Sequence, residues 1–150
     1  MKDLKITHRN KNEINDDLIL EFELKYNIKF PEYLIEFLKK YSGCTTVEDT
    51  YINPNFNIFY TVSYFCELYS DYNPSIQKLT EGNKFYHYEN WIPFATDPGG
   101  WVFNISISQN NMGEIWINKF DSSEENPFEF VAPSFENFID GLKTEEESNF

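Results

Sequence analysis

The stretch WIPFATDPGGWVF surrounds one Asp-Pro-Gly-Gly loop with apolar and aromatic residues, and Asp97 is its single ionisable side chain. A glycine-rich turn can hold phosphate when a helix begins directly after it, and an aspartate can ligate a metal. Here a strand pattern follows the glycines, and acids such as Glu89 and Asp121 are too isolated to complete a metal site. We therefore predict a structural hairpin loop. Gly99 and Gly100 should supply positive φ, and Asp97 should hydrogen-bond the loop's own backbone.

Nucleophilic catalysis needs a nucleophile beside a base that a third group orients. The histidines are His8 and His87, and neither shares a recognisable motif with Cys44 or Cys66. The two cysteines form no CxxC pair, so we expect buried free thiols. No carboxylate pair has a spacing that singles it out for acid–base chemistry. The sequence thus predicts a protein that is not an enzyme, with no catalytic residue, cofactor or metal.

The charge of the chain is strongly negative, with 25 acidic and 12 basic residues and a formal net charge of -13. Residues 1–40 are balanced, so the whole excess lies in 41–150, which carries seventeen acidic and four basic residues. Nucleic acids and anionic membranes require clustered Lys and Arg, so we expect neither as a direct partner. Such acidity would attract a basic protein and accelerate its association, although it also serves solubility alone.

At 150 residues the chain is predicted to form one domain with a sizeable core. Its hydrophobic content of 41% and aromatic content of 19% are too high for a disordered protein. The opening MKDLKITHRNKN has no apolar run, which excludes a signal peptide at this point and favours a cytoplasmic protein. The sequence is compatible with both a monomer and a homodimer.

Helical patterns occur near both ends of the chain. Asn15 can cap a helix that runs to Tyr26, and a second helix starts at Pro31 and ends before Gly43. Ser134 can cap a C-terminal helix. Residues 62–72 are predicted to form a further helix. The apolar stripes expected to face the core are Leu18, Phe22 and Tyr26; Leu34, Phe37, Leu38 and Tyr41; Phe65, Leu68 and Tyr72; and Phe135, Phe138, Ile139 and Leu142.

Strand patterns fill most of the remaining chain. Residues 47–52 and 56–62 are short, β-branched and aromatic, and an Asn-Pro-Asn turn separates them. Pro93 should confine its strand to a sheet edge or a bulge. Alternation from Trp101 to Ile107 predicts a strand with one buried face. Further strands are expected at 91–95, 114–120 and 128–131, and residues 73–90 give no clear pattern.

Taken in order, several segments resemble the SUKH superfamily, which includes a fungal cell-wall assembly regulator and many bacterial toxin-immunity proteins. The segments are FELKYNIKFPEYLIEFLKKYSGC, WIPFATDPGGWVFNISIS, GEIWINKF and APSFENFIDGL, and they span about Ile14 to Leu142. The matched positions are Phe30, Pro31, Tyr33 and Gly43, then Trp91 to Ile107, then Ser134, Phe135, Glu136 and Phe138. The family's acidic cluster after the Trp strand is replaced here by Asn118, Lys119, Phe120 and Asp121.

The resemblance implies a single α+β domain with an antiparallel sheet, an N-terminal helix pair and a C-terminal helix packed mainly on one face. We divide the chain into a flexible N-terminus at 1–13, a SUKH-like domain at 14–142 and an acidic tail at 143–150. Bacterial members neutralise contact-dependent or secreted toxins, many of them nucleases, by binding them.

The resemblance and the charge together predict a cytosolic immunity protein that blocks a cognate toxin, a basic and possibly nuclease domain, through an acidic interface. The alternative is a regulatory scaffold with a cellular partner that is not a toxin. Contacts are expected from acidic residues on exposed loops and sheet rims, flanked by Tyr or Trp. The candidates are Glu48, Asp49, Asp71, Asp121, Glu124 and Glu125.

Overall fold

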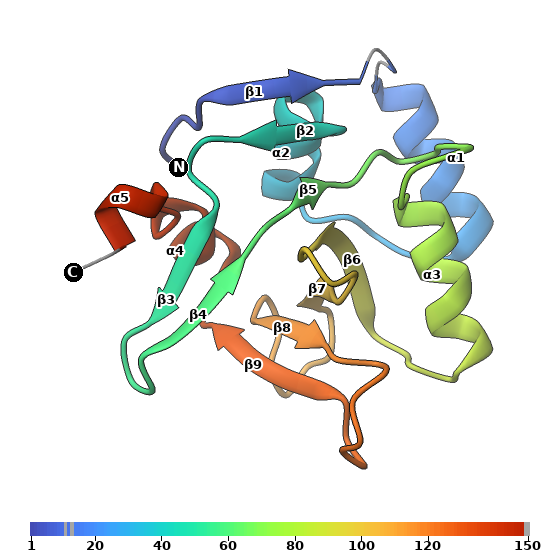
Figure 1. The fold of residues 1–150 in the computed structure, drawn as a ribbon. Coiled ribbons are helices and arrows are strands. Elements are labelled where there is room, and N and C mark those ends of the chain that lie inside the picture. Colours follow the sequence, from blue (N-terminus) through green and yellow to red (C-terminus); the bar gives the residue numbers. More distant parts are fainter. Residues whose placement is uncertain (11, 13, 149–150) are drawn as a thin grey trace.

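The computed structural model describes residues 1–10, 12 and 14–148, which combine helices with antiparallel strands (Figure 1). In chain order the elements are β1 (Ile6–Arg9), α1 (Asp16–Tyr26), α2 (Glu32–Tyr41), β2 (Cys44–Thr46), β3 (Thr50–Asn53), β4 (Ile58–Thr61), β5 (Tyr64–Phe65), α3 (Ile76–Phe85), β6 (Trp91–Thr96), β7 (Val102–Ser106), β8 (Ile115–Asn118), β9 (Phe128–Ala132), α4 (Phe135–Asp140) and α5 (Glu145–Ser148). The predicted α+β class is confirmed.

The central sheet of the described chain has five antiparallel strands in the order β5-β6-β7-β8-β9. The register shifts between Pro93 and Ala95, so the predicted bulge is present. The short strand β5 pairs only with Ala95 and Thr96, so Pro93 has no ladder partner on that side. The prediction of one buried face for the strand after Trp101 is wrong: every residue of β7 is buried, because layers cover both sides of the sheet.

The inner face of the sheet carries the main core. Phe103 and Ile117 lie opposite each other in the register, and Phe94 and Phe103 both contact Phe138 of α4. Phe37 of α2 packs edge-on against Phe135 with ring centroids 5.0 Å apart. Such aromatic pairs stabilise the fold beyond the burial of their apolar surface, so they strengthen the packing of α2 and α4 against this face.

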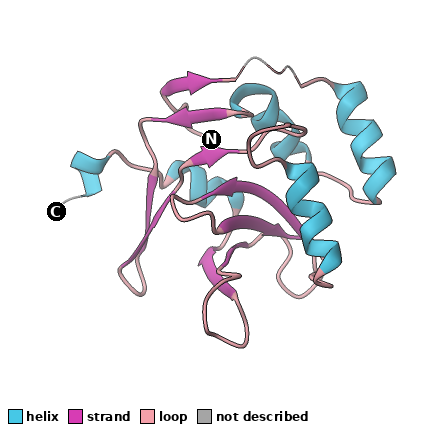
Figure 2. Cartoon of the chain, turned by 45° about the vertical axis from the view of Figure 1, so that its right-hand side comes forward, coloured by secondary structure: helices cyan, strands magenta, loops and turns pink. Residues whose placement is uncertain are grey.

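The outer face of the sheet is covered in part by α3, which lies next to α1 (Figures 1 and 2). The Tyr26 hydroxyl donates to Glu81, and Lys84 Nζ donates to the carbonyl of Tyr26, so the two helices are tied together. The sequence pattern of residues 73–90 did not predict this helix. The helix predicted at 62–72 is wrong, because the segment contains β5 and a loop in which Tyr72 is 96% exposed.

The predicted helix caps at both ends of the chain are confirmed. Asn15 accepts a hydrogen bond from the Leu18 backbone N–H, and Ser134 accepts one from Asn137. Ser75 caps α3 in the same way. Each cap satisfies a backbone donor that the first helical turn would otherwise leave free.

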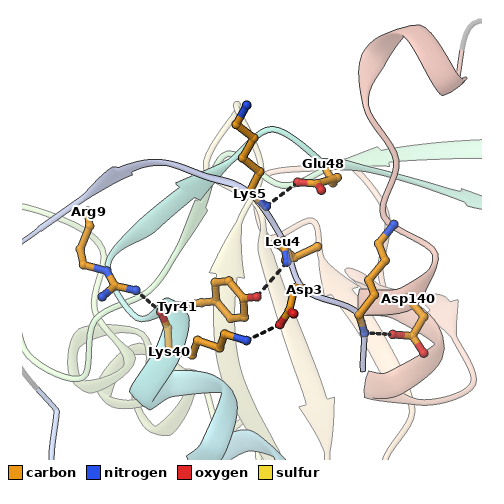
Figure 3. A network of polar contacts seen from close by, with 9 residues as sticks. Asp3, Leu4, Lys5, Arg9, Lys40, Tyr41, Glu48 and Asp140 are labelled. Atoms are coloured by element: carbon orange, nitrogen blue, oxygen red, sulfur yellow. Dashed lines mark hydrogen bonds and ion pairs between the residues drawn. The ribbon is translucent and has the colours of Figure 1, made fainter.

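The N-terminal segment is held against the body of the protein (Figure 3). Lys2 N–H donates to Asp140, Leu4 N–H to the Tyr41 hydroxyl and Lys5 N–H to Glu48. Residues Ile6–Arg9 then pair with β2. Part of the N-terminal segment predicted to be flexible, Ile6–Arg9, thus forms a strand. The sequence missed β1 because all four of its residues are exposed and give no apolar alternation.

The acidic C-terminal tail contains the short helix α5, in which Ser148 is buried. The backbone N–H of Lys143 donates to the Thr50 carbonyl, and the N–H of Thr50 donates to the Lys143 carbonyl. These two hydrogen bonds hold the start of the tail against β3. Four residues of the two terminal segments, Lys11, Glu13, Asn149 and Phe150, lie outside the described residues. The boundaries proposed for the domain stay predictions.

Candidate functional site: an aromatic sheet face with acidic surroundings

A group of aromatic side chains crosses the outer face of the sheet. Trp116 pairs with Asn104 on one side and with Phe130 on the other, so these three side chains lie on the same face. The Trp91 ring stacks on Phe128 with centroids 4.4 Å apart and meets Trp116 at 6.1 Å. We call the connected set the aromatic face; its members are Phe85, Tyr86, Tyr88, Trp91, Trp116, Phe128 and Phe130.

The aromatic face remains partly open to solvent. Trp91, Trp116, Phe128 and Phe130 are all half-buried, and Tyr86 is exposed. Tyr and Trp are the residues that most often dominate the binding energy of protein interfaces, because they bury a large rigid surface and keep one polar group. The face therefore has the composition of a protein-binding surface.

Carboxylates border the aromatic face at several points. Glu114 accepts a hydrogen bond of 3.0 Å from the Trp116 indole N–H, which fixes the orientation of that ring. Glu89 is exposed and lines a hollow with Tyr88 and Trp91. An incoming cationic side chain would thus find an aromatic surface and a carboxylate side by side.

The loop between β8 and β9 leads into this face at Phe128 and carries three of the predicted contact residues, Asp121, Glu124 and Glu125, all exposed. Asp121 accepts a hydrogen bond from the Trp101 indole N–H. Glu124 and Glu125 are the exposed acids nearest in sequence to the aromatic face on this side.

The other predicted contact residues lie elsewhere. Glu48 and Asp49 lie in the segment that connects β2 to β3, and Asp71 lies in the segment between β5 and α3, where it lines a hollow with Leu18 of α1. Figure 1 shows both segments away from the loop between β8 and β9. Glu48 accepts from Lys5 N–H at 2.8 Å, and Asp49 accepts from the Thr50 hydroxyl, so both carboxylates have partners within the fold. The six candidates therefore do not form one patch.

The Asp97 loop joins β6 to β7 as a tight hairpin. Asp97 Oδ1 accepts from Gly99 N–H at 3.0 Å and from Trp101 N–H at 2.8 Å. Gly100 has a φ of +92°, whereas the positive φ predicted at Gly99 is wrong. One carboxylate oxygen of Asp97 thus accepts hydrogen bonds from two backbone N–H groups of the loop. Gly100 is the glycine of this loop that adopts the left-handed backbone conformation.

In the described chain, neither histidine considered for catalysis hydrogen-bonds a cysteine: His8 Nε2 contacts Asn10 Oδ1, and Cys44 Sγ accepts from Arg9 Nε. Cys44 and Cys66 are both buried and free, and burial raises the pKa of the Cys66 thiol far above its usual range. A thiol with so high a pKa is a poor nucleophile. His87 is exposed in the turn after α3. Within the described residues, no group of three or more His, Cys, Asp or Glu side chains could hold a metal ion.

Aromatic residues were expected beside the acids, but these particular rings were not predicted. The available signal was the alternation in WIP, IWIN and FEF, where Trp or Phe occupies the position opposite to the core. Tyr86 and Tyr88 could not be placed, because the pattern of residues 73–90 was not recognised as a helix.

The fold and this surface together define a class: an α+β domain whose antiparallel sheet presents partly exposed aromatic rings with carboxylates around them. A family model described as the SMI1 / KNR4 family (SUKH-1) matches residues 13–141, which is most of the chain. The chain belongs to this family. No significant match was found among curated proteins or solved structures. Membership is consistent with a toxin-immunity or protein-interaction role.

Across the described part of the chain, no helix is both long and apolar enough to cross a membrane.

Proposed function

We propose that this protein is an immunity protein that acts in the cytoplasm, where it binds and neutralises the toxin domain of a bacterial polymorphic toxin system. The observation that carries the proposal is the aromatic face with its neighbouring carboxylates, in a SUKH-1 chain with a net charge of -13. Aromatic rings supply affinity at the centre of an interface, and the surrounding charge supplies speed and specificity of association.

A nuclease is the toxin class that fits this surface best. A nuclease must carry Lys and Arg where it grips phosphate, so an acidic protein can cover that groove and exclude the nucleic acid. In the proposed complex, Glu124 and Glu125 face the basic groove and Trp91 and Trp116 form the centre. Glu48, Asp49 and Asp71 contribute to the long-range field only.

The proposal is tested with the toxin encoded beside the gene for this protein. Co-expression should restore the growth of cells that produce the toxin, and purified proteins should form a complex by calorimetry. Trp116→Ala should weaken binding by about 30-fold or more, because removal of a central Trp costs about 2 kcal/mol or more at interface hot spots.

Tyr72→Ala is the matched control, since it removes an aromatic ring that is 96% exposed on a different loop. Equal affinities for the two variants would show that the aromatic face is not the interface. If the neighbouring gene encodes no toxin, or if co-expression gives no protection, the scaffold alternative takes precedence.

A further inference from the structure

Helix α1 carries two exposed leucines on the side that faces away from the core. Ile19, Phe22 and Tyr26 are buried, whereas Leu20 is 55% exposed and Leu24 is 75% exposed. Residues four apart lie one above the other on a helix, so the two leucines form one apolar ridge. Figures 1 and 2 show α1 at the periphery of the molecule, next to α3. The outer face of a surface helix normally carries polar residues, so this leucine ridge indicates a contact with another molecule.

Two charged side chains lie alongside the leucine ridge. Glu21 and Lys25 are both exposed and are also four residues apart, so they follow the same flank of the helix. Within the described residues neither side chain has an ion-pair partner, and Lys25 Nζ lies 5.3 Å from the centroid of the Tyr26 ring. The outer side of α1 therefore combines an apolar ridge with one acid and one base that are available to a second molecule.

We propose that α1 binds α1 of a second copy of this protein in antiparallel orientation, across a two-fold axis at the level of residue 22. In such a symmetric contact, residue i of one copy meets residue j of the other, and j meets i. Leu20 then packs on Leu24 of the second copy, and Leu24 packs on its Leu20. A two-fold axis keeps the same flank of both helices on the same side, so Glu21 lies beside Lys25 of the second copy.

The charges of α1 favour this occupant and this orientation. Asp16 and Asp17 occupy the first turn of the helix, and Lys25 occupies the last. An antiparallel contact places each first turn beside the last turn of the second copy, so side-chain charges and helix dipoles are complementary at both ends. A parallel contact would instead place Glu21 beside Glu21. Residues 1–40 carry eight acidic and eight basic groups, so two copies can approach here without the repulsion that the acidic remainder would cause.

The contact is small, so the dimer should be weak. α1 has 11 residues and spans about 16 Å at a rise of about 1.5 Å per residue. Two helices of this length bury less than the roughly 1,200 Å² at the lower end of stable interfaces. We therefore expect a dissociation constant on the order of 100 μM. The aromatic face is built by other elements, so this inference does not depend on the proposed function.

Sedimentation velocity of the full chain, from about 10 μM to about 1 mM, tests the leucine ridge. The wild type should shift from monomer to dimer, whereas Leu24→Gln should associate at least tenfold more weakly, because the dimer loses two leucine contacts. Met112→Gln is the matched control, since Met112 is an exposed apolar residue, at 61%, outside α1. A wild type that stays monomeric, or a Leu24→Gln variant that dimerises equally well, would overturn the inference.

An exchange of charges tests the antiparallel geometry. Glu21→Lys places two bases side by side and Lys25→Glu places two acids, so each variant alone should dimerise about threefold more weakly or worse. Replacing an acid by a base changes the net charge by +2, from -13 to -11, so Glu21→Lys would strengthen association if net charge alone mattered. A mixture of the two variants should dimerise at least as well as the wild type, because every flanking contact between them joins opposite charges. Failure of the mixture to recover would contradict the antiparallel contact.

Toxin binding distinguishes this contact from a second toxin-binding surface. Leu24→Gln should leave the affinity for the toxin unchanged. If Leu24→Gln weakens toxin binding and leaves self-association intact, α1 belongs to the toxin interface and the inference fails. Absence of toxin binding by the wild type would instead count against the proposed function, because sedimentation of the protein alone is independent of the toxin.

Discussion

At the scale of single residues, Gly43 shows how one backbone position supports the protein's interior. Its φ is +73°, and a Cβ at this position would lie 2.9 Å from Glu67 Cγ. Glu67 is only 2% exposed, so its side chain has little room to move away. The glycine therefore permits both the turn after α2 and the close approach of Glu67.

Gly43→Ala should destabilise the protein by about 1–2 kcal/mol from the left-handed backbone alone, and by more once the contact with Glu67 is included. The control is Gly82→Ala, which has free space around the new methyl group and a helical backbone. Urea unfolding should show a lower midpoint for Gly43→Ala and an equal or higher one for Gly82→Ala. If both variants unfold at the wild-type midpoint, the packing described around Gly43 is incorrect.

At the scale of elements, the hairpin of β3 and β4 protects the free edge of the main sheet. The single O–H of Tyr60 is shared between Glu129 Oε2 at 2.7 Å and the Phe130 carbonyl at 3.3 Å, and Asn53 Nδ2 donates to the Val131 carbonyl. These bonds occupy carbonyls of β9 that would otherwise be open to pairing with another chain.

Tyr60→Phe should lower the free energy of unfolding by about 1 kcal/mol, the usual net contribution of a hydrogen bond. Hydrogen exchange should accelerate in β3, β4 and β9 more than in α1, because only the attachment of the hairpin is weakened. Tyr72→Phe, which removes the hydroxyl of an exposed tyrosine, serves as the control. An even loss of protection over all elements would show that the hairpin and β9 do not form a separate local unit.

Elements with a strong local pattern could be predicted from the sequence, and those defined by tertiary contacts could not. The helices after Asn15 and Ser134 have a cap and an apolar stripe, and both were found. The sequence of α3 buries the polar residues Thr80 and Asn83, so its buried side does not look apolar. β5 has only two residues, and its helix-like surroundings misled the prediction.

The site follows the same rule. The composition indicated acidic residues with aromatic neighbours. The position of each ring of the aromatic face, however, depends on the register between β7, β8 and β9. Asn83 and Asn118 are 35 residues apart in the chain and line the same cavity only because α3 packs on the outer face.

At the scale of the whole molecule, buried and half-buried tyrosines make the fold sensitive to alkali. Burial is the main cause that raises the pKa of Tyr64 to about 12, and it also raises the pKa values of Tyr33, Tyr51 and Tyr69. The unfolded chain loses these protons near pH 10, whereas the folded protein keeps them. Stability is therefore fully present below about pH 10 and declines as the pH rises towards about 12.

Tyr64→Phe should make the decline of the urea midpoint between pH 10 and 12 less steep, because one of the titrating groups is gone. The slope with pH is the relevant quantity, since the variant also loses the bond from Asn10 Nδ2 to the Tyr64 hydroxyl at every pH. Tyr72→Phe, at a fully exposed site, should leave the slope unchanged. Equal slopes for wild type and Tyr64→Phe would refute the assignment.

The net charge of -13 leads to a final prediction about association with the proposed toxin. Charge steering acts on the approach of the partners and is screened by salt beyond about 10 Å at 0.1 M ionic strength. The association rate should fall at least tenfold between 20 mM and 500 mM NaCl, while the dissociation rate changes little, as stopped-flow measurements can show.

The association rate should depend on where the negative charges lie as well as on the net charge. Glu124→Gln with Glu125→Gln removes two charges from the β8–β9 loop, and Glu145→Gln with Glu146→Gln removes two from α5, on another part of the molecule (Figure 1). If the loop faces the basic groove, the loop variant should slow association several-fold more than the α5 variant at low salt. Equal effects would mean that the protein attracts its partner through net charge alone, and the interface would then have to be sought away from this loop.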